Sequence, residues 1–230
     1  MDSFAAQSSS SVLRETLLSR KPNPLAPVAM AMATLVVVLL SIAAWTDFAG
    51  AEEWMRASRD AVFSKHQYWK AWTTLFVHGD GKHLLSNSFL FFILGTFLTG
   101  YFGITRVLLS ALIFGGLTNL YVLQGMPAEV HLIGLSGVVF WMGGAWLILY
   151  FMIDRKRTLM HRFLRAMGVG LLLFMPAEAF DASISYESHF VGFILGIIAG
   201  LLYFYFNKKS LREAEIYEAA PIEDESAAVF

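Results

Sequence analysis

The chain alternates between long apolar runs and shorter polar segments. Six runs approach the roughly 20 apolar residues that an α-helix needs to cross a bilayer. They cover residues 27–45, 83–101, 107–123, 136–153, 163–180 and 189–206. Pro176 and Glu178 interrupt the fifth run, a break that helical bundles tolerate because neighbouring helices satisfy the freed backbone groups. The pattern predicts an all-α membrane protein with a bundle of six transmembrane helices.

Basic residues between the runs predict how the helices are oriented, because Lys and Arg accumulate on the cytoplasmic side of a membrane. A cytoplasmic N-terminus puts twelve Lys and Arg residues inside and five outside, all five in or beside the loop 46–77. Both termini are therefore predicted to be cytoplasmic. The resulting organisation is a polar tail at 1–24, a six-span domain at 25–206 and a polar, acidic tail at 207–230.

The outer loop 46–77 is unusually long for a connection in a compact bundle. It carries Trp54, Tyr68, Trp69 and Trp72 among charged residues, and aromatic rings of this kind prefer the membrane interface. We expect short helices here that lie partly in the outer leaflet.

Composition agrees with a membrane protein and narrows the chemistry. Hydrophobic residues make up 57% of the 230 residues and charged residues 15%, against about 45–50% and about 25% in soluble domains. The net charge of −1 provides no overall positive potential that would attract nucleic acid. The chain has no cysteine, which excludes disulfides, thiolate metal sites and a cysteine nucleophile.

The segment Gly134-Leu135-Ser136-Gly137 places a hydroxyl between two glycines where a polar loop meets the fourth apolar run. Glycine lets another backbone approach closely, and the first turn of a helix offers free N–H groups. These are the parts of a serine nucleophile and an oxyanion site. Small residues also mediate helix packing in membranes, so the four residues alone leave both interpretations open.

Other polar residues lie at the same predicted membrane face. His83 and Asn87, four residues apart on one helix face, open the second run, and His189 opens the sixth. The spacing of His189, Gly192, Gly196 and Gly200 places all four on one face, which suits close approach to the fourth helix. A histidine beside a serine can act as base and then as acid in acyl transfer.

Alternatives to this chemistry stay open for each group. His83 and Asn87 also suit hydrogen bonding between helices, and the glycines suit packing alone. A catalytic carboxylate would have to come from Glu178, Asp181 or Glu187, in the fifth run or an exposed loop. No HExxH motif is present and the histidines lack an obvious carboxylate partner, so we expect neither metal nor cofactor.

Taken together, the motifs resemble those of the rhomboid family of intramembrane serine proteases, from about Trp69 to Gly200. The matching elements are His78-(x4)-His83-(x3)-Asn87, Gly134-Leu135-Ser136-Gly137 and His189-x-x-Gly192-x-x-x-Gly196. The resemblance implies that Ser136 is the nucleophile and His189 its general base. It implies oxyanion stabilisation by the His83 and Asn87 side chains and the Ser136 backbone N–H. Supporting roles fall to Gly134, Gly137, Phe140, Gly192 and Gly196.

Two positions depart from the family pattern. Lys70 follows Trp69 where relatives carry arginine, and lysine lacks the planar fork of that side chain. Ser188 stands where relatives often have alanine or glycine. The size and span pattern resemble the six-helix bacterial type, which implies the inner membrane, an active site facing the periplasm, and transmembrane proteins as substrates.

Two other classes of protein compete with this interpretation. A catalytically silent rhomboid-like protein that binds membrane clients should lack the serine or the histidine, and both are present. A small transporter or channel should carry charged residues in mid-span and an internal repeat. The polar residues of this chain gather near one face instead.

Overall fold

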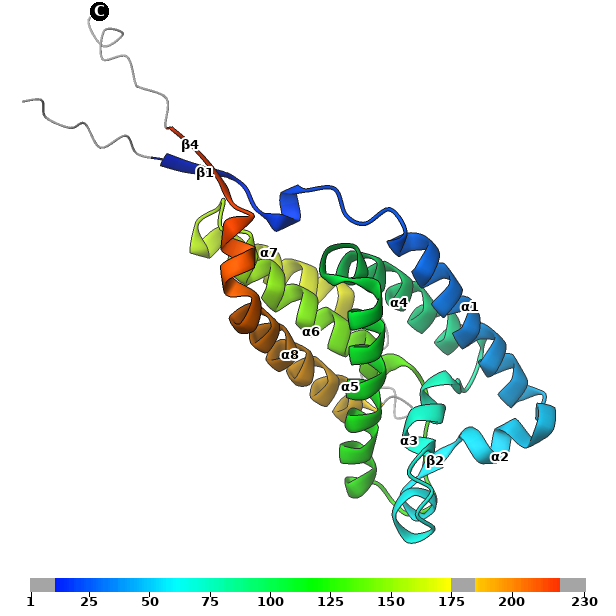
Figure 1. The fold of residues 1–230 in the computed structure, drawn as a ribbon. Coiled ribbons are helices and arrows are strands. Elements are labelled where there is room, and N and C mark those ends of the chain that lie inside the picture. The colour runs from blue at the N-terminus through cyan, green and yellow to red at the C-terminus, as the bar shows by residue number, and fades with distance from the viewer. Residues whose placement is uncertain (1–10, 175–184, 220–230) are drawn as a thin grey trace, which may run out of the picture.

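Helices dominate the computed structural model, which describes residues 11–174 and 185–219 (Figure 1). The longer helices are α1 (Ala26–Trp45), α4 (Gly81–Phe102), α5 (Ile104–Gly125), α6 (Ser136–Ile153), α7 (Leu159–Phe174) and α8 (Tyr186–Glu213). The loop between α1 and α4 holds η2 (Phe48–Gly50), α2 (Ala51–Met55), β2 (Ala57–Ser58), η3 (Asp60–Ser64), α3 (Lys70–Thr73) and η4 (Thr74–Phe76). The remaining elements are β1 (Ser11–Glu15), η1 (Leu17–Ser19), β3 (His131–Leu132) and β4 (Ile216–Ala219).

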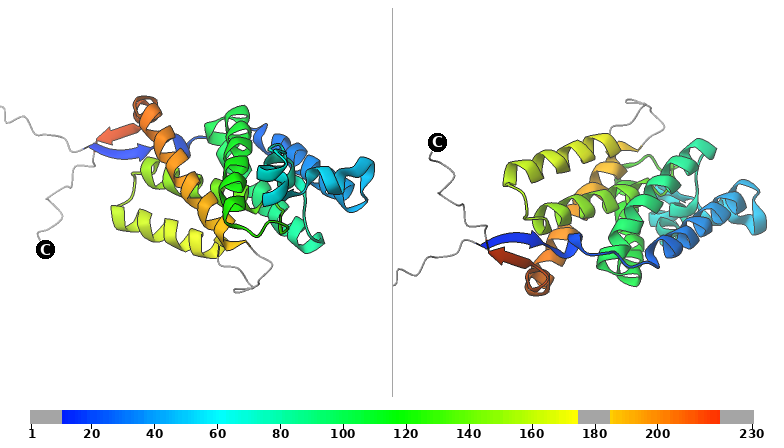
Figure 2. Two further views of the ribbon diagram at one scale, coloured as in Figure 1. Left: turned by 90° about the horizontal axis from the view of Figure 1, so that it is seen from below. Right: turned by 90° about the horizontal axis from the view of Figure 1, so that it is seen from above.

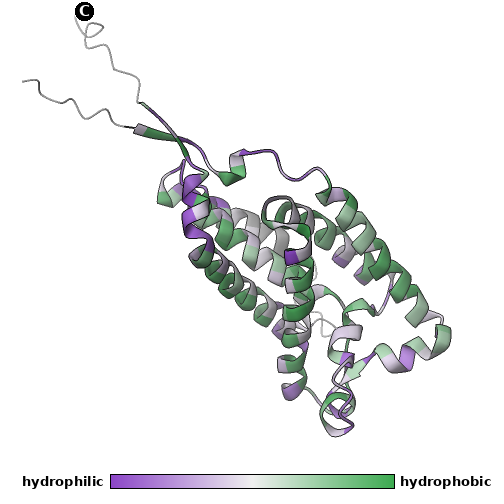
Figure 3. Ribbon diagram, viewed as in Figure 1, coloured by the Kyte–Doolittle hydropathy of each residue, from purple (hydrophilic) through white to green (hydrophobic). Residues whose placement is uncertain are grey.

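Five of the described helices are long and apolar enough to cross a membrane, namely α1, α4, α5, α6 and α8. Green predominates along their middles in Figure 3, whereas purple gathers at the C-terminal end of α8 and in the long loop. Helix α7 covers only part of the predicted fifth run, because residues 175–180, with Pro176 and Glu178, lie outside the described part of the chain. The sixth span and the cytoplasmic termini therefore stay predictions.

Helix α6 is the centre of the bundle. Of the five apolar helices it has the largest buried share, 56% of its apolar window against 22% in α1 and in α8. It packs against α4, α5, α7 and α8, with the most extensive contact to α8. Figures 1 and 2 show α8 lying along one side of α6 while α1 lies beyond α4. A residue at the head of α6 is thus reached from several helices.

The first turns of α4, α6 and α8 meet at one end of the bundle. A Cβ added to Gly134, just before α6, would lie 2.8 Å from His83 Cε1 in α4. One added to Gly137 in α6 would lie 2.9 Å from Ser188 Oγ in α8. The long loop lies at the same end, where β2 pairs with β3 through Ala57↔Leu132 and Ser58↔His131. The short helices expected in this loop are confirmed; their depth in the membrane stays a prediction.

The chain's tail segments depart from the solvated, structureless tails that their polar composition favours. Strand β1 pairs antiparallel with β4, and Arg14 bridges Glu218 at 3.0 Å. Between α8 and β4, the side chain of Glu215 is only 3% exposed and accepts from Arg155 at 2.7 Å and Arg212 at 2.6 Å. Burial alone would raise the pKa of Glu215, but the hydrogen bonds from these partners lower it. The cluster ties the end of α8 to the segment that follows α6.

Replacing Glu215 with glutamine should lower the free energy of unfolding in detergent by about 1–2 kcal/mol. The effect is sizeable because the hydrogen bonds to the buried carboxylate are charge-assisted. Solvent screening of the partly exposed guanidinium groups limits it. Thermal unfolding monitored by circular dichroism measures the change. Glu213→Gln is the matched control, because within residues 11–174 and 185–219 the ion pair of Glu213 is with Lys209 alone, at 4.0 Å on an exposed surface. Equal melting of the two variants would show that the cluster contributes nothing.

Candidate active site

The turn that precedes Ser136 is fixed to the outer loop. Gly134 has φ +110°, a conformation that favours glycine, and its N–H donates to the Thr74 carbonyl at 3.1 Å. The Thr74 hydroxyl in turn donates to the carbonyl of Leu132. Helix α6 then starts at Ser136, which is half-buried. The sequence therefore places this hydroxyl on the first turn of a helix, as predicted.

The glycines of α6 and α8 bring the two backbones into contact. A Cβ on Gly192 would lie 3.1 Å from the carbonyl carbon of Gly137 and 3.3 Å from its Cα. A Cβ on Gly196 would lie 2.9 Å from the backbone nitrogen of Ala145. The face-sharing glycines predicted from the spacing thus pack directly against the helix that Ser136 begins.

His189 lies at the head of this contact. Its ring stacks on Phe140 with centroids 4.1 Å apart and planes 9° apart, and the Tyr186 ring approaches edge-on at 6.2 Å. Phe140 is one turn after Ser136 on the same face of α6, so the stack brings the imidazole to the face that carries the hydroxyl. The imidazole therefore packs against α6 one turn from Ser136, and a hydrogen bond between the two side chains stays a prediction.

His83 and Asn87 border the glycine turn from the other side. Asp80 caps α4 by accepting from the His83 backbone N–H at 2.8 Å, which fixes the first turn of the helix. A Cβ on Gly134 would lie 2.9 Å from His83 Nε2 and 3.7 Å from Asn87 Nδ2. Asn87 is 6% exposed, and its Nδ2 has no acceptor among the described residues.

An unpaired buried amide is costly unless something else accepts its hydrogen bond. The first N–H groups of a helix likewise have no intrahelical acceptor, and they carry partial positive charge. Asn87 Nδ2 and the first N–H groups of α6 are therefore suited to donate hydrogen bonds to a negatively charged oxygen.

The candidate acids do not complete a triad in the described part of the chain. Glu178 and Asp181 lie outside the described residues. Glu187 is exposed in the first turn of α8 and faces the end of α5, with Oε1 3.9 Å from a Cβ built on Gly125. No salt bridge between described residues includes His189. Among the described residues no acid thus joins His189, and the serine–histidine dyad stays a prediction.

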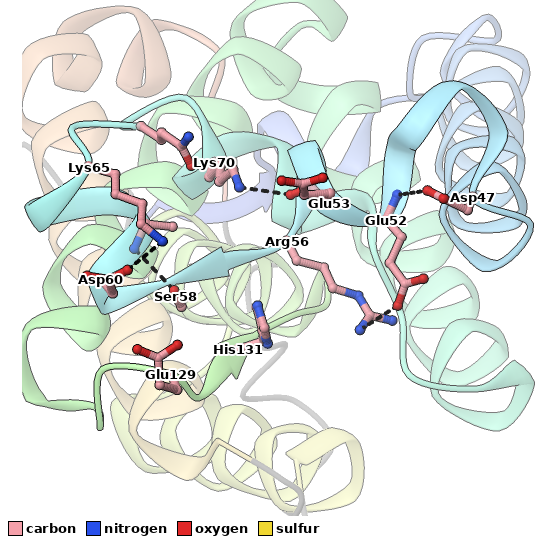
Figure 4. Close-up of a pocket in the computed structure, with 12 residues that line it drawn as sticks. Asp47, Glu52, Glu53, Arg56, Ser58, Asp60, Lys65, Lys70, Glu129 and His131 are labelled. Atoms are coloured by element: carbon pink, nitrogen blue, oxygen red, sulfur yellow. Dashed lines mark hydrogen bonds and ion pairs between the residues drawn. The ribbon is translucent and has the colours of Figure 1, made fainter.

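A separate cavity of about 430 Å³ opens in the outer loop and is lined by charged side chains (Figure 4). Four of the eight charged side chains form ion pairs, Arg56 with Glu52 at 2.9 Å and Lys65 with Asp60 at 2.8 Å. Lys70 is 7% exposed and donates to the Glu53 carbonyl at 2.8 Å, and burial lowers its pKa. The Lys70 ammonium makes one hydrogen bond to the loop backbone, whereas the planar guanidinium of arginine could make two in parallel.

The fold and the site together define a class: a multi-pass helical membrane protein whose polar residues converge beside a glycine-bordered serine. Comparison with known proteins makes the assignment specific. Residues 65–206, more than half of the chain, match the rhomboid domain. A protein of Acanthamoeba polyphaga mimivirus that bears the rhomboid name is 29% identical over 133 residues, which cover 56% of this chain and 71% of the relative. The chain belongs to the rhomboid family.

Proposed function

We propose that the protein is an intramembrane serine endopeptidase that cleaves transmembrane segments of other membrane proteins. The observation that carries the proposal is the stacking of His189 on Phe140, one turn below Ser136, across a backbone contact that only glycine permits. Membership of the rhomboid family, whose members are usually serine proteases, supports the same activity. Ser136 is the nucleophile and His189 the general base, with no cofactor required.

Acylation begins when Ser136 Oγ attacks the carbonyl carbon of the scissile peptide and His189 takes the hydroxyl proton. The carbonyl oxygen becomes an oxyanion, which the Ser136 N–H, Asn87 Nδ2 and an N–H of the His83 ring stabilise. The C–N bond then breaks as His189 returns the proton to the leaving amine. The products of this half-reaction are a free amine and an ester on Ser136.

Deacylation repeats the chemistry with water as the nucleophile. His189 removes a proton from water, hydroxide adds to the ester, and the proton goes to Ser136 Oγ as the ester bond breaks. Water must reach Ser136, and the half-buried Ser136, His83 and His189 at the end of the bundle allow that access. We place this end at the outer face of a bacterial inner membrane, with both termini and the tails in the cytoplasm.

The substrate class follows from the backbone. A transmembrane helix hides its carbonyls in its own hydrogen bonds, so the substrate must unwind locally before Ser136 can reach a peptide bond. Glycine or other helix-destabilising residues near the outer membrane face should therefore mark the cleavage region. The predicted fifth span, of which α7 is the described part, is our candidate for a lateral entrance; Pro176 and Glu178 lie outside the described residues.

A fluorophosphonate probe tests the proposal without knowledge of the substrate. Such probes phosphonylate only a serine that a nearby base activates, so the reconstituted protein should be labelled on the peptide that contains Ser136. His189→Ala should lose the label because the base is gone. A wild-type protein that stays unlabelled would contradict the proposal and favour the catalytically silent, client-binding alternative.

A further inference from the structure

Helix α1 lies outside the matched rhomboid segment, yet one of its side chains reaches toward the active-site turn. Ser41, near the end of α1, is fully buried. Its Oγ lies 2.6 Å from the Phe76 carbonyl and 2.9 Å from His78 Nδ1. His78 is also fully buried, and its own carbonyl accepts from Trp45 Nε1 at 2.7 Å. Two side chains of α1 therefore hold the segment just before α4.

The hydrogen bonds around His78 specify one tautomer. A serine has a single proton to donate, and the Phe76 carbonyl can only accept, so the Ser41 proton goes to that carbonyl. The contact between Ser41 and the ring then requires the proton on His78 Nδ1, which leaves Nε2 as an acceptor. Nε2 faces the backbone N–H of Leu135 at 3.4 Å, a donor. All three contacts are satisfied together only with the Nδ1–H form.

Burial supports a neutral ring. It lowers the pKa of His78 to about 4, with a further contribution from nearby His83, while the Phe76 carbonyl and Asp80 oppose the shift. A protonated ring would turn Nε2 into a second donor against the Leu135 N–H. The neutral ring lies 5.0 Å from that of His83, centroid to centroid, so it also borders the candidate oxyanion site.

We propose that Ser41 and His78 are positioning residues that connect α1 to the nucleophile turn through a hydrogen-bonded relay. Ser41 fixes the tautomer of His78, and His78 Nε2 holds the Leu135 N–H directly before Ser136. The Gly134 N–H is bonded to the Thr74 carbonyl, so the two hydrogen bonds orient the successive peptide groups of Gly134 and Leu135. The relay thereby fixes the backbone from which α6 presents Ser136. The catalytic consequence rests on the proposed function; the geometry of the relay does not.

Ser41→Ala should lower kcat for cleavage of a reconstituted transmembrane substrate by about tenfold to a hundredfold, the size expected when a reacting group is misplaced by an ångström or less. KM should stay within a factor of about two, because neither residue touches the substrate. Thr34→Val is the matched control. It removes a hydroxyl two turns earlier on α1 that is buried but has no hydrogen-bond partner among the described residues.

Two NMR measurements keep the relay testable whatever the activity. The ring ¹⁵N shifts of wild-type His78 should report the Nδ1–H tautomer, and an Nε2–H ring would overturn the relay. The Leu135 amide should exchange with solvent faster in Ser41→Ala than in wild type or Thr34→Val, and unchanged exchange would overturn it as well. If both NMR results hold but the wild-type protein cleaves nothing, the proposed function fails and the relay stands.

Discussion

Ser136→Ala and His189→Ala should each reduce kcat for cleavage of a transmembrane substrate in proteoliposomes by about 10³-fold or more. Without Oγ no acyl-enzyme forms, and without the imidazole the hydroxyl keeps its proton at neutral pH. The two losses should not add in the double variant, because the residues act as a unit. Product formation followed by mass spectrometry gives both the rate and the cleaved bond.

The control for this prediction is a second serine at the same contact. Ser188 is buried, and its Oγ lies 2.9 Å from the position of a Cβ on Gly137, but its backbone N–H bonds to Ser185 Oγ at 3.3 Å as part of the α8 cap. Ser188→Ala should leave kcat within a factor of about three, since alanine fits a site that has no role in proton transfer. Strong loss in Ser188→Ala, or retained cleavage in His189→Ala, would refute the serine–histidine dyad.

The parts of the site that the sequence predicts are those encoded locally. Membrane-length apolar runs define the helices, and a spacing of three or four residues places side chains on one face. That is why His83 and Asn87 could be placed together, and why His189 could be placed at the head of a glycine stripe. Alternation of helix direction then brings the starts of α4, α6 and α8 to one end, where the structure has them.

The relay was not predictable because its partners are distant in sequence and individually unremarkable. Ser41 is one hydroxyl in an apolar helix, and only the packing of α1 against the segment 76–78 reveals its partners. His78 belongs to a motif, but its spacing says nothing of whether it lies at the surface or, as found, fully buried. A single sequence carries no signal for contacts that span 37 and 57 residues.

The chain ends show the same limit. Hydropathy ends the last run at residue 206, yet α8 continues to Glu213, because its final residues are charged and form helix well. The pairing of β1 with β4 joins segments about 200 residues apart that both look solvated by composition. The burial of the Glu215 carboxylate is explained only by the structure, which places Arg155 and Arg212 beside it.

Gly196→Ala should destabilise the protein by about 3 kcal/mol, at the upper end for overpacking, because the added methyl meets backbone rather than a side chain that can turn away. The new Cβ would lie against the Trp141 carbonyl and 2.9 Å from the Ala145 nitrogen, so α6 and α8 must separate. At roughly 2–4 °C per kcal/mol, the melting temperature in detergent should fall by about 10 °C. Gly196→Val should fall further.

Gly168→Ala isolates the effect of this contact from that of replacing any helical glycine. Gly168 lies in α7, and a Cβ there would meet nothing within 4 Å. This variant should melt at or slightly above the wild-type temperature, since alanine favours a helix by about 0.5–1 kcal/mol over glycine. Gly196→Ala should also slow fluorophosphonate labelling of Ser136, because His189 moves with α8. If Gly196→Ala melts within a degree or two of Gly168→Ala, α6 and α8 are not in backbone contact. The glycine stripe then no longer explains how His189 reaches the serine.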